Sequence, residues 1–298
     1  MIEPDRLDRE PSRCFARMLA AYHQGGVRSA SAVYARAFEA ANAAADPRWN
    51  IRLLSCAVLF FSPVLALHRV ERAWSLARQH EMRDEETPSR ANLGLVHLEL
   101  GDREEAKRHL HACLALLAGG PRSVVLNNLA LAVSPADRSH ALRLLASSLA
   151  HAERADAVAI LSNQAAIQAA DRPVHLPNFS SLVAWATEAC APPLVERVRF
   201  NHVQALLEQG KARAALQAAD AVAVREEDHR DGALVVGQWA RLRRDIYREL
   251  GRPYPPVLDA QAATLDRSAE RQAWLYRTRW ALCPLPLCGP AAAGKARA

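Results

Sequence analysis

The sequence predicts an all-α protein made of antiparallel helix hairpins that stack one on the next. Apolar residues recur at helical spacing from about Pro11 to Trp280, whereas alternation with a period of two never persists. Gly and Pro breaks leave helices of roughly 12 to 18 residues joined by short turns. A set of small and polar residues then returns at intervals of about 33 to 37 residues, as expected for stacked hairpins.

Composition agrees with this fold class. Half of the 298 residues are hydrophobic and only 6% are aromatic, while alanine is abundant. The hydrophobic share excludes disorder over most of the length, and many alanines favour closely packed helices over a β-sandwich.

The helices are expected in the order in which breaks divide the chain. Gly25-Gly26 divides a first hairpin over 11–43, and Ser62-Pro63 lies inside a second segment over 47–82. The clearest repeats are 88–121, 124–153 and 197–224. The first of them turns at Gly101-Asp102. A further hairpin begins near Gly232, and 155–190 is irregular because Pro173 and Pro177 stand where a regular turn should be.

The repeat is most legible over residues 92–116. Asn92-Leu93-Gly94, Gly101-Asp102, Ala106 and Cys113 have counterparts at Asn128, Ala141 and Ser148, and again at Asn201, Gly210 and Ala215. This stretch resembles a tetratricopeptide repeat, which has a small residue in its first helix, Gly-Asp at the turn and Ala early in its second helix. The resemblance implies a right-handed superhelical α-solenoid over residues 11–282, with a tail at 1–10 and a disordered tail at 283–298.

The resemblance also implies that the first helices line a concave face that holds a protein or peptide. The residues expected on that face, by spacing, are Phe15, Leu19, Ala91, Asn92, Leu95, Leu98, Asn127, Asn128, Leu131, Arg197, Phe200, Asn201, Gln204, Leu207 and Arg241. The recurring asparagine bonds a peptide backbone in that family, or bonds between adjacent helices; both roles stay open. A family clamp for a terminal carboxylate is not expected here, because its places hold Ala91 and Leu95, so an amphipathic helix or an apolar peptide would suit this face better.

Charge is uneven along the chain. Residues 1–240 carry 27 basic and 27 acidic residues, and residues 241–298 carry 11 and 5. A basic end can attract nucleic acid, anionic lipid or an acidic partner, or can be an ordinary solvated surface. The residues of a possible anion or nucleic-acid patch are Arg241, Arg243, Arg244, Arg248, Arg271, Arg277 and Arg279.

Other motifs are incomplete. Gly289 to Lys295 fits a phosphate loop only up to the lysine, since Ala296 follows in place of Ser or Thr. Cys283 and Cys288 could form a small disulfide, hold a metal with outside help or bind haem. His109 and His111 are two residues apart and so diverge on a helix. No catalytic residue, cofactor site or metal site is expected.

We expect a cytoplasmic protein with reduced thiols. The segment MIEPDRLDRE has no apolar core, the most apolar run is interrupted by Pro63, and the six cysteines lack the spacing of a secreted disulfide scaffold. The leading hypothesis is a non-enzymatic scaffold, adaptor or regulatory subunit that binds a protein or peptide. Alternatives are a helical repeat that binds nucleic acid and a peptide-sensing module that acts on a partner in trans. No binding to membranes is expected.

Overall fold

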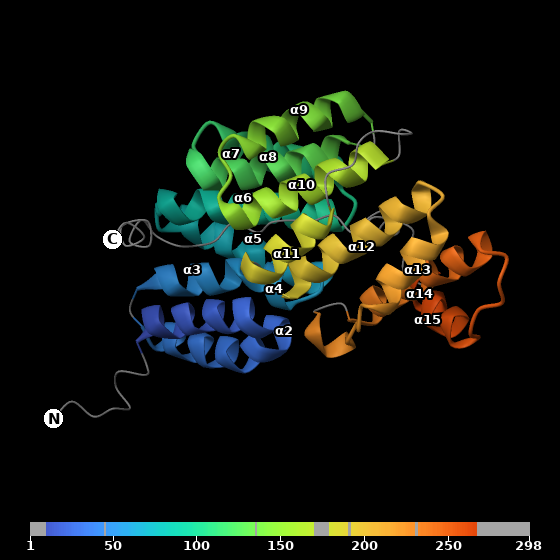
Figure 1. Cartoon of the computed structure of the whole chain (residues 1–298). Helices are drawn as coiled ribbons and strands as arrows, with labels where there is room; N and C mark the ends of the chain where they lie inside the picture. The colour runs from blue at the N-terminus through green and yellow to red at the C-terminus, as the bar shows by residue number, and fades with distance from the viewer. Residues whose placement is uncertain are drawn as a thin grey trace.

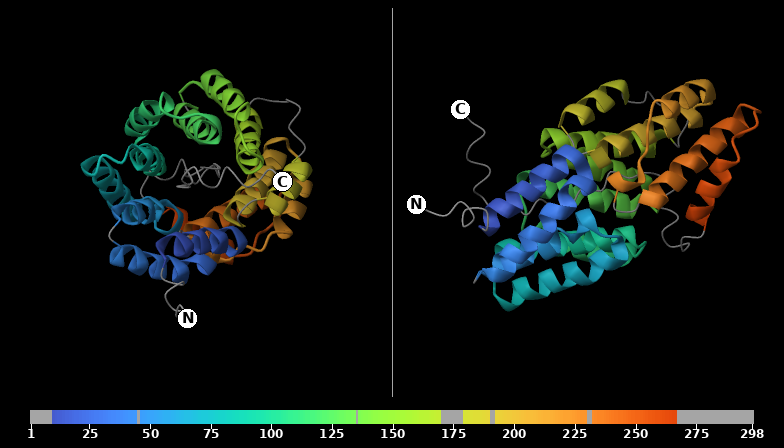
Figure 2. Two further views of the ribbon diagram at one scale, coloured as in Figure 1. Left: turned by 90° about the vertical axis from the view of Figure 1, so that its left-hand side faces the viewer. Right: turned by 90° about the horizontal axis from the view of Figure 1, so that it is seen from below.

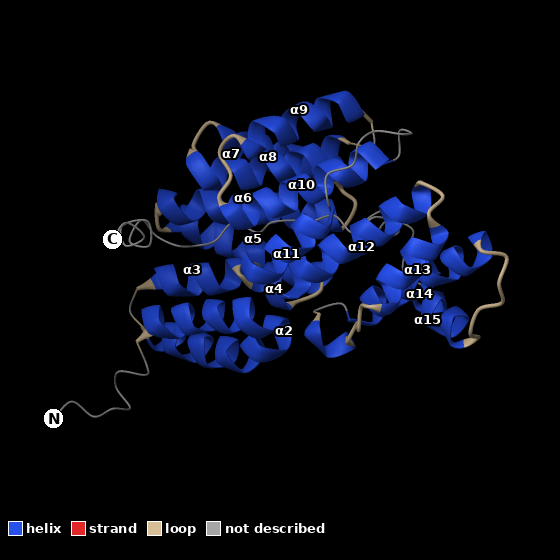
Figure 3. Ribbon diagram, in the orientation of Figure 1, coloured by secondary structure: helices blue, strands red, loops and turns tan. Residues whose placement is uncertain are grey.

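A computed structural model describes residues 10–266, apart from 45, 135, 170–178, 190–191 and 230–231. All regular elements in these described ranges are helices (Figure 3), as the sequence predicts. The helices are α2 (Pro11–Ala43), α3 (Pro47–Ser55), α4 (Ala57–Phe60), α5 (Pro63–Gln79), α6 (Arg83–Glu99), α7 (Arg103–Leu114), α8 (Gly119–Val133), α9 (Arg138–Leu149), α10 (Arg154–Ala169), α11 (Phe179–Ala189), α12 (Pro192–Glu208), α13 (Ala212–Asp220), the short 3₁₀ helix η1 (Glu226–Asp228), α14 (Gly232–Glu249) and α15 (Val257–Asp266).

Consecutive helices pack against one another as neighbouring pairs (Figure 1). The pairs are α6 with α7, α8 with α9, α10 with α11, α12 with α13 and α14 with α15. Helix α2 is itself a hairpin, because Gly26 has φ 67° and ψ −154° and breaks it in two. The two arms share one apolar cluster that contains Phe15, Met18, Ala30 and Ala37.

Local sequence explains where these helices begin and end. Pro11, Pro47 and Pro63 stand in the first turns of α2, α3 and α5, where a missing N–H costs nothing. The turns after α6 and α12 use Gly101 and Gly210 at φ 84° and 71°, a region that residues with a Cβ adopt at a cost.

Small residues let the paired helices approach closely. A Cβ placed on Gly94 of α6 would lie 2.9 Å from Cγ of Leu110 on α7, so any larger residue would force the Leu110 side chain to shift. Ala106 is fully buried, and so are Ala73 and Ala77 of α5 and Ala141 of α9. Glycine and alanine therefore stand where the paired helices pack closely.

Buried polar side chains run through the first helices of successive pairs. These residues, which we call the polar ladder, are no more than 2% exposed: Ser55 (α3), Asn92 (α6), Asn127 and Asn128 (α8), Ser162 and Asn163 (α10), Asn201 (α12) and Gln238 (α14). These residues recur on successive first helices, which also contact one another.

The two segments that depart from the repeat pattern also form paired helices. In 47–82 the first helix is interrupted between α3 and α4 at Cys56, and α5 packs on both α3 and α6. In 155–190, α10 packs on α11 and continues the stack by contacting α12. Pro173 and Pro177 lie outside the described residues.

The N-terminal helix α2 lies beside helices from the C-terminal half of the chain. In Figure 2 (left), the helices are arranged around a common centre. Helix α2 contacts α12 and η1, and Nη1 of Arg28 lies 3.4 Å from Oε1 of Glu227.

Within the described ranges, no helix is long and apolar enough to cross a bilayer.

Candidate functional site

Most residues predicted for the concave face are buried in the packed layers. Side chains no more than 5% exposed are Phe15, Ala91, Asn92, Leu95, Leu98, Asn127, Asn128, Leu131, Phe200 and Asn201. Leu19, Arg197, Gln204, Leu207 and Arg241 are half-buried. The buried members are not open to solvent, because each first helix is covered by its own partner helix and by the neighbouring pairs. Partner binding at this face stays a prediction.

The recurring asparagines bond neighbouring helices. Nδ2 of Asn92 donates to Oγ of Ser55 at 3.0 Å, which joins α6 to α3. Nδ2 of Asn201 donates to Oγ of Ser162 at 3.0 Å, which joins α12 to α10.

The same bonding links α8 to α10. Nδ2 of Asn163 donates to Oδ1 of Asn127 at 2.8 Å, and Nδ2 of Asn127 donates to Oδ1 of Asn128 at 3.1 Å. Of the two roles left open by the sequence, the structure therefore shows bonding between helices.

Three arginines of the basic patch, Arg243, Arg244 and Arg248, bond to groups within the chain. Nη2 of Arg243 donates to the carbonyls of Ala219 and Val222 at 2.8 and 3.1 Å, so it ties α14 to the end of α13. Arg244 pairs with Asp259 of α15 at 3.2 Å, and Arg248 lies 3.5 Å from Asp245. Arg271, Arg277 and Arg279 lie outside the described residues, as do Cys283, Cys288 and the segment 289–295. Nucleic-acid binding stays a prediction.

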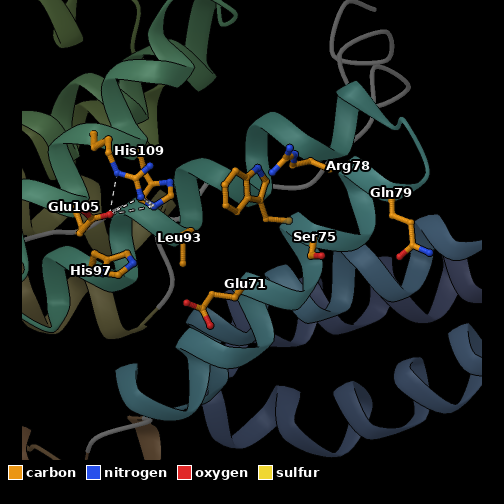
Figure 4. A pocket seen from close by; sticks show the side chains of 10 residues that line it. Glu71, Ser75, Arg78, Gln79, Leu93, His97, Glu105 and His109 are labelled. Atoms are coloured by element: carbon orange, nitrogen blue, oxygen red, sulfur yellow. Dashed lines mark hydrogen bonds and ion pairs between the residues drawn. The ribbon is translucent and has the colours of Figure 1, made fainter.

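A groove lies between the second helices α5 and α7, with α6 at its floor (Figure 4). It is a pocket of about 690 Å³, and we call it the α5–α7 groove. The residues that line it are Glu71, Trp74, Ser75, Arg78 and Gln79 from α5, Leu93 and His97 from α6, and Glu105, Arg108 and His109 from α7.

Helical periodicity explains why these residues meet. Positions 71, 74, 75 and 78 lie on one face of α5, and 105, 108 and 109 lie on one face of α7. The turn at Gly101-Asp102 brings α6 back against α7, so the rings of His97 and His109 stack at 5.5 Å with an interplanar angle of 8°. Trp74 meets His109 edge-on, with ring centroids 5.5 Å apart.

His109 is the most buried titratable group of the groove. Its side chain is 2% exposed, and burial, together with the neighbouring Arg108, His97 and Arg90, lowers its pKa to about 4. The ring is therefore neutral at pH 7. His111, two residues on, is exposed, so the predicted divergence of the two histidines is confirmed.

Arginines surround the indole of Trp74. The guanidinium carbons of Arg78 and Arg90 lie 5.3 and 5.5 Å from its ring centroid, within the range of cation–π attraction. On the opposite wall, Nε of Arg108 donates to Oε2 of Glu105 at 2.9 Å, and this bond lowers the pKa of Glu105.

The groove presents carboxylate, guanidinium, imidazole and indole groups, which can bind polar partners. In the described ranges, no three His, Cys, Asp or Glu side chains are placed to hold a metal ion. Burial raises the pKa of the Cys113 thiol to about 11, so it is not a reactive thiolate at neutral pH.

The prediction from sequence missed the α5–α7 groove because it considered the first helices as the binding face. The signal that could have found it was the pair of histidines on the two helices of one hairpin, preceded by a tryptophan on the helix before. No family model matches the chain, and no curated protein matches it.

Proposed function

We propose that the chain is a tetratricopeptide-like α-solenoid with a right-handed superhelical course, and that it acts as a non-enzymatic scaffold, adaptor or regulatory subunit in the cytoplasm. The observation that carries this proposal is the register of the stack. Buried polar residues recur at successive first helices, and small residues recur at the crossings within each pair.

This arrangement favours binding over catalysis. A stack of hairpins holds its shape through contacts between neighbours and presents long surfaces along both layers of helices. Its buried polar side chains bond the helices together, and the groove with concentrated polar side chains lies at the surface between α5 and α7. A surface of this kind suits a protein or a peptide segment.

The proposal is tested by isolating a partner. The full-length chain carrying an affinity tag is expressed in its native host, cross-linked in cells and purified, and co-purified proteins are identified by mass spectrometry. We expect one protein to be enriched and, once purified, to bind the full-length chain saturably by isothermal titration calorimetry.

The opposite result is also defined. If no partner is recovered in repeated experiments and the purified chain turns over a substrate, the scaffold proposal is wrong. A matched chain with Ala106→Leu, whose packing is disturbed, serves as a control for binding that needs the folded array.

A further inference from the structure

Unpartnered buried nitrogens gather around the α5–α7 groove. They are Nε1 of Trp74, Nδ1 of His109 and Nε of Arg90, whereas Nδ1 of His97 lies 3.7 Å from Oδ2 of Asp102. A buried polar group without a partner costs about 1–3 kcal/mol, so several of them around one pocket call for an explanation. In the polar ladder, by contrast, the amide nitrogens of Asn92, Asn127, Asn163 and Asn201 are all bonded.

Most of these unpartnered atoms are donors. The indole N–H of Trp74 and the Nε–H of Arg90 can only donate. Nη2 of Arg108 lies 3.1 Å from Nε2 of His109, and because a guanidinium has no acceptor, this ring nitrogen accepts. The neutral ring of His109 then carries its proton on Nδ1, which is the unpartnered atom. These buried donors therefore lack an acceptor.

The charged side chains of the groove favour a small anionic group as the acceptor for these donors. Arg78 is exposed and lies over Trp74, and its ion pair with Glu86 is long, at 3.9 Å. Its flexible, exposed side chain can turn to meet an anion beside the indole ring. Glu71 and Glu105 also line the groove (Figure 4), so a polyanion that filled it would meet two carboxylates. A single acidic side chain that enters beside Arg78 avoids both, and neighbouring acidic residues of the same peptide stay outside the groove, in solvent.

We propose that the α5–α7 groove receives an acidic side chain of a protein partner, whose carboxylate accepts hydrogen bonds from Arg78 and from the indole N–H of Trp74. This inference rests on the proposed binding function and names the chemistry of one contact. The groove lies on second helices, so it is separate from the apolar concave face that the sequence predicts on the first helices.

The test follows the indole signals of the full-length chain by NMR after ¹⁵N labelling of tryptophan. The chain has six tryptophans, and Trp74→Phe identifies the signal of Trp74. The probes are a tetraglutamate peptide with both ends blocked, the matched tetraglutamine peptide and inorganic phosphate. We expect tetraglutamate to shift the Trp74 signal saturably, and tetraglutamine to leave it unmoved.

Two variants locate the contact. Arg78→Ala should weaken the tetraglutamate titration about tenfold, because it removes one charge-assisted contact. Arg83→Ala, an exposed arginine outside the groove, should leave the titration unchanged. Circular dichroism confirms that both variants fold, as expected for exposed side chains.

Three results would overturn the inference: an unmoved Trp74 signal, an equal response to tetraglutamine, or an equal response to phosphate, which would make the groove a small-anion site. Capture of a native partner separates this failure from that of the proposed function. If the wild-type chain and Arg78→Ala hold the partner equally, the groove inference fails while the scaffold proposal stands.

Discussion

The polar ladder and the α5–α7 groove handle buried polar groups in opposite ways. In the ladder, the amides of Asn92, Asn127, Asn163 and Asn201 donate to a side chain on a neighbouring first helix or on their own helix. In the groove, the rings of Trp74 and His109 pack against each other, but each leaves a nitrogen without a hydrogen bond.

This difference shows that repeated residues supply one another with hydrogen-bond partners. When a polar residue recurs on successive first helices, each copy lies next to a polar residue of the neighbouring helix. Hydrogen bonds between them then follow from the way the helices pack. The groove residues occur once, and no neighbouring pair supplies their partners. Recurring polar residues thus indicate structure, and isolated ones indicate a contact that comes from outside the chain.

The ladder is tested most severely by Asn127→Leu. This change leaves Nδ2 of Asn163 and Oδ1 of Asn128 without their partners in a fully buried place. We expect the free energy of unfolding to fall by about 2–5 kcal/mol, since each orphaned group costs about 1–3 kcal/mol. Urea unfolding followed by circular dichroism measures it, with Asn42→Leu, an exposed asparagine of α2, as the control. Equal midpoints for the two variants would show that the ladder does not stabilise the stack.

The groove is tested by pH. Because the pKa of His109 is about 4 in the folded chain and near 6.5 when unfolded, the unfolded state binds the proton first as pH falls. Stability that is fully present above pH 6.5 is therefore lost between pH 6.5 and 4, by roughly 2–3 kcal/mol. The groups that face this ring are Arg108, His97, Arg90 and Glu105.

His109→Gln should remove that part of the pH dependence. The free energy of unfolding is measured for wild type and for the variant at pH 7, 5.5 and 4.5. The stability of wild type relative to the variant should decrease as pH falls. Parallel curves would contradict the depressed pKa of His109.

The close approach within a pair is tested by Ala106→Leu. Ala106 is fully buried, so a larger side chain must displace its neighbours, and overpacking of this kind costs about 1–3 kcal/mol. Ala214→Leu, at an exposed place on the second helix α13, should change the thermal midpoint much less. Similar losses in both variants would show that the crossing at Ala106 tolerates bulk.

The smallest effect is expected for Ser55→Ala, at the start of the ladder. It removes the acceptor of the 3.0 Å bond from Asn92, a loss of about 0.5–1.5 kcal/mol. A double-mutant cycle with Asn92→Ala measures the coupling between the two side chains, and additive losses would show that this bond contributes nothing.

Much of the fold could be predicted from residues that act locally. The turns at Gly101-Asp102 and Gln209-Gly210 and the small residues at 94 and 106 mark one hairpin after another, and the structure confirms them. Segment 47–82 was harder, because α3 and α4 are short pieces interrupted at Cys56, and helical periodicity is weak in pieces of this length.

The candidate site was largely out of reach. A helical pattern marks Trp74, His97 and His109 as residues on three different helices, but the distance between helices depends on packing. Likewise, spacing placed Asn92 and Leu95 on the first helix, while their burial depends on the neighbouring pairs that cover it.

By itself the sequence determined the helices, their pairing into hairpins and the points at which backbones touch, because propensity, capping and side-chain size act over a few residues. Only the tertiary structure decided that the asparagines bond one another across the stack and that α5 and α7 enclose a groove of unpartnered donors. The physical reason is that the hydrogen bonds between successive pairs join residues 36 to 39 positions apart in the chain, whose distance depends on how the pairs stack.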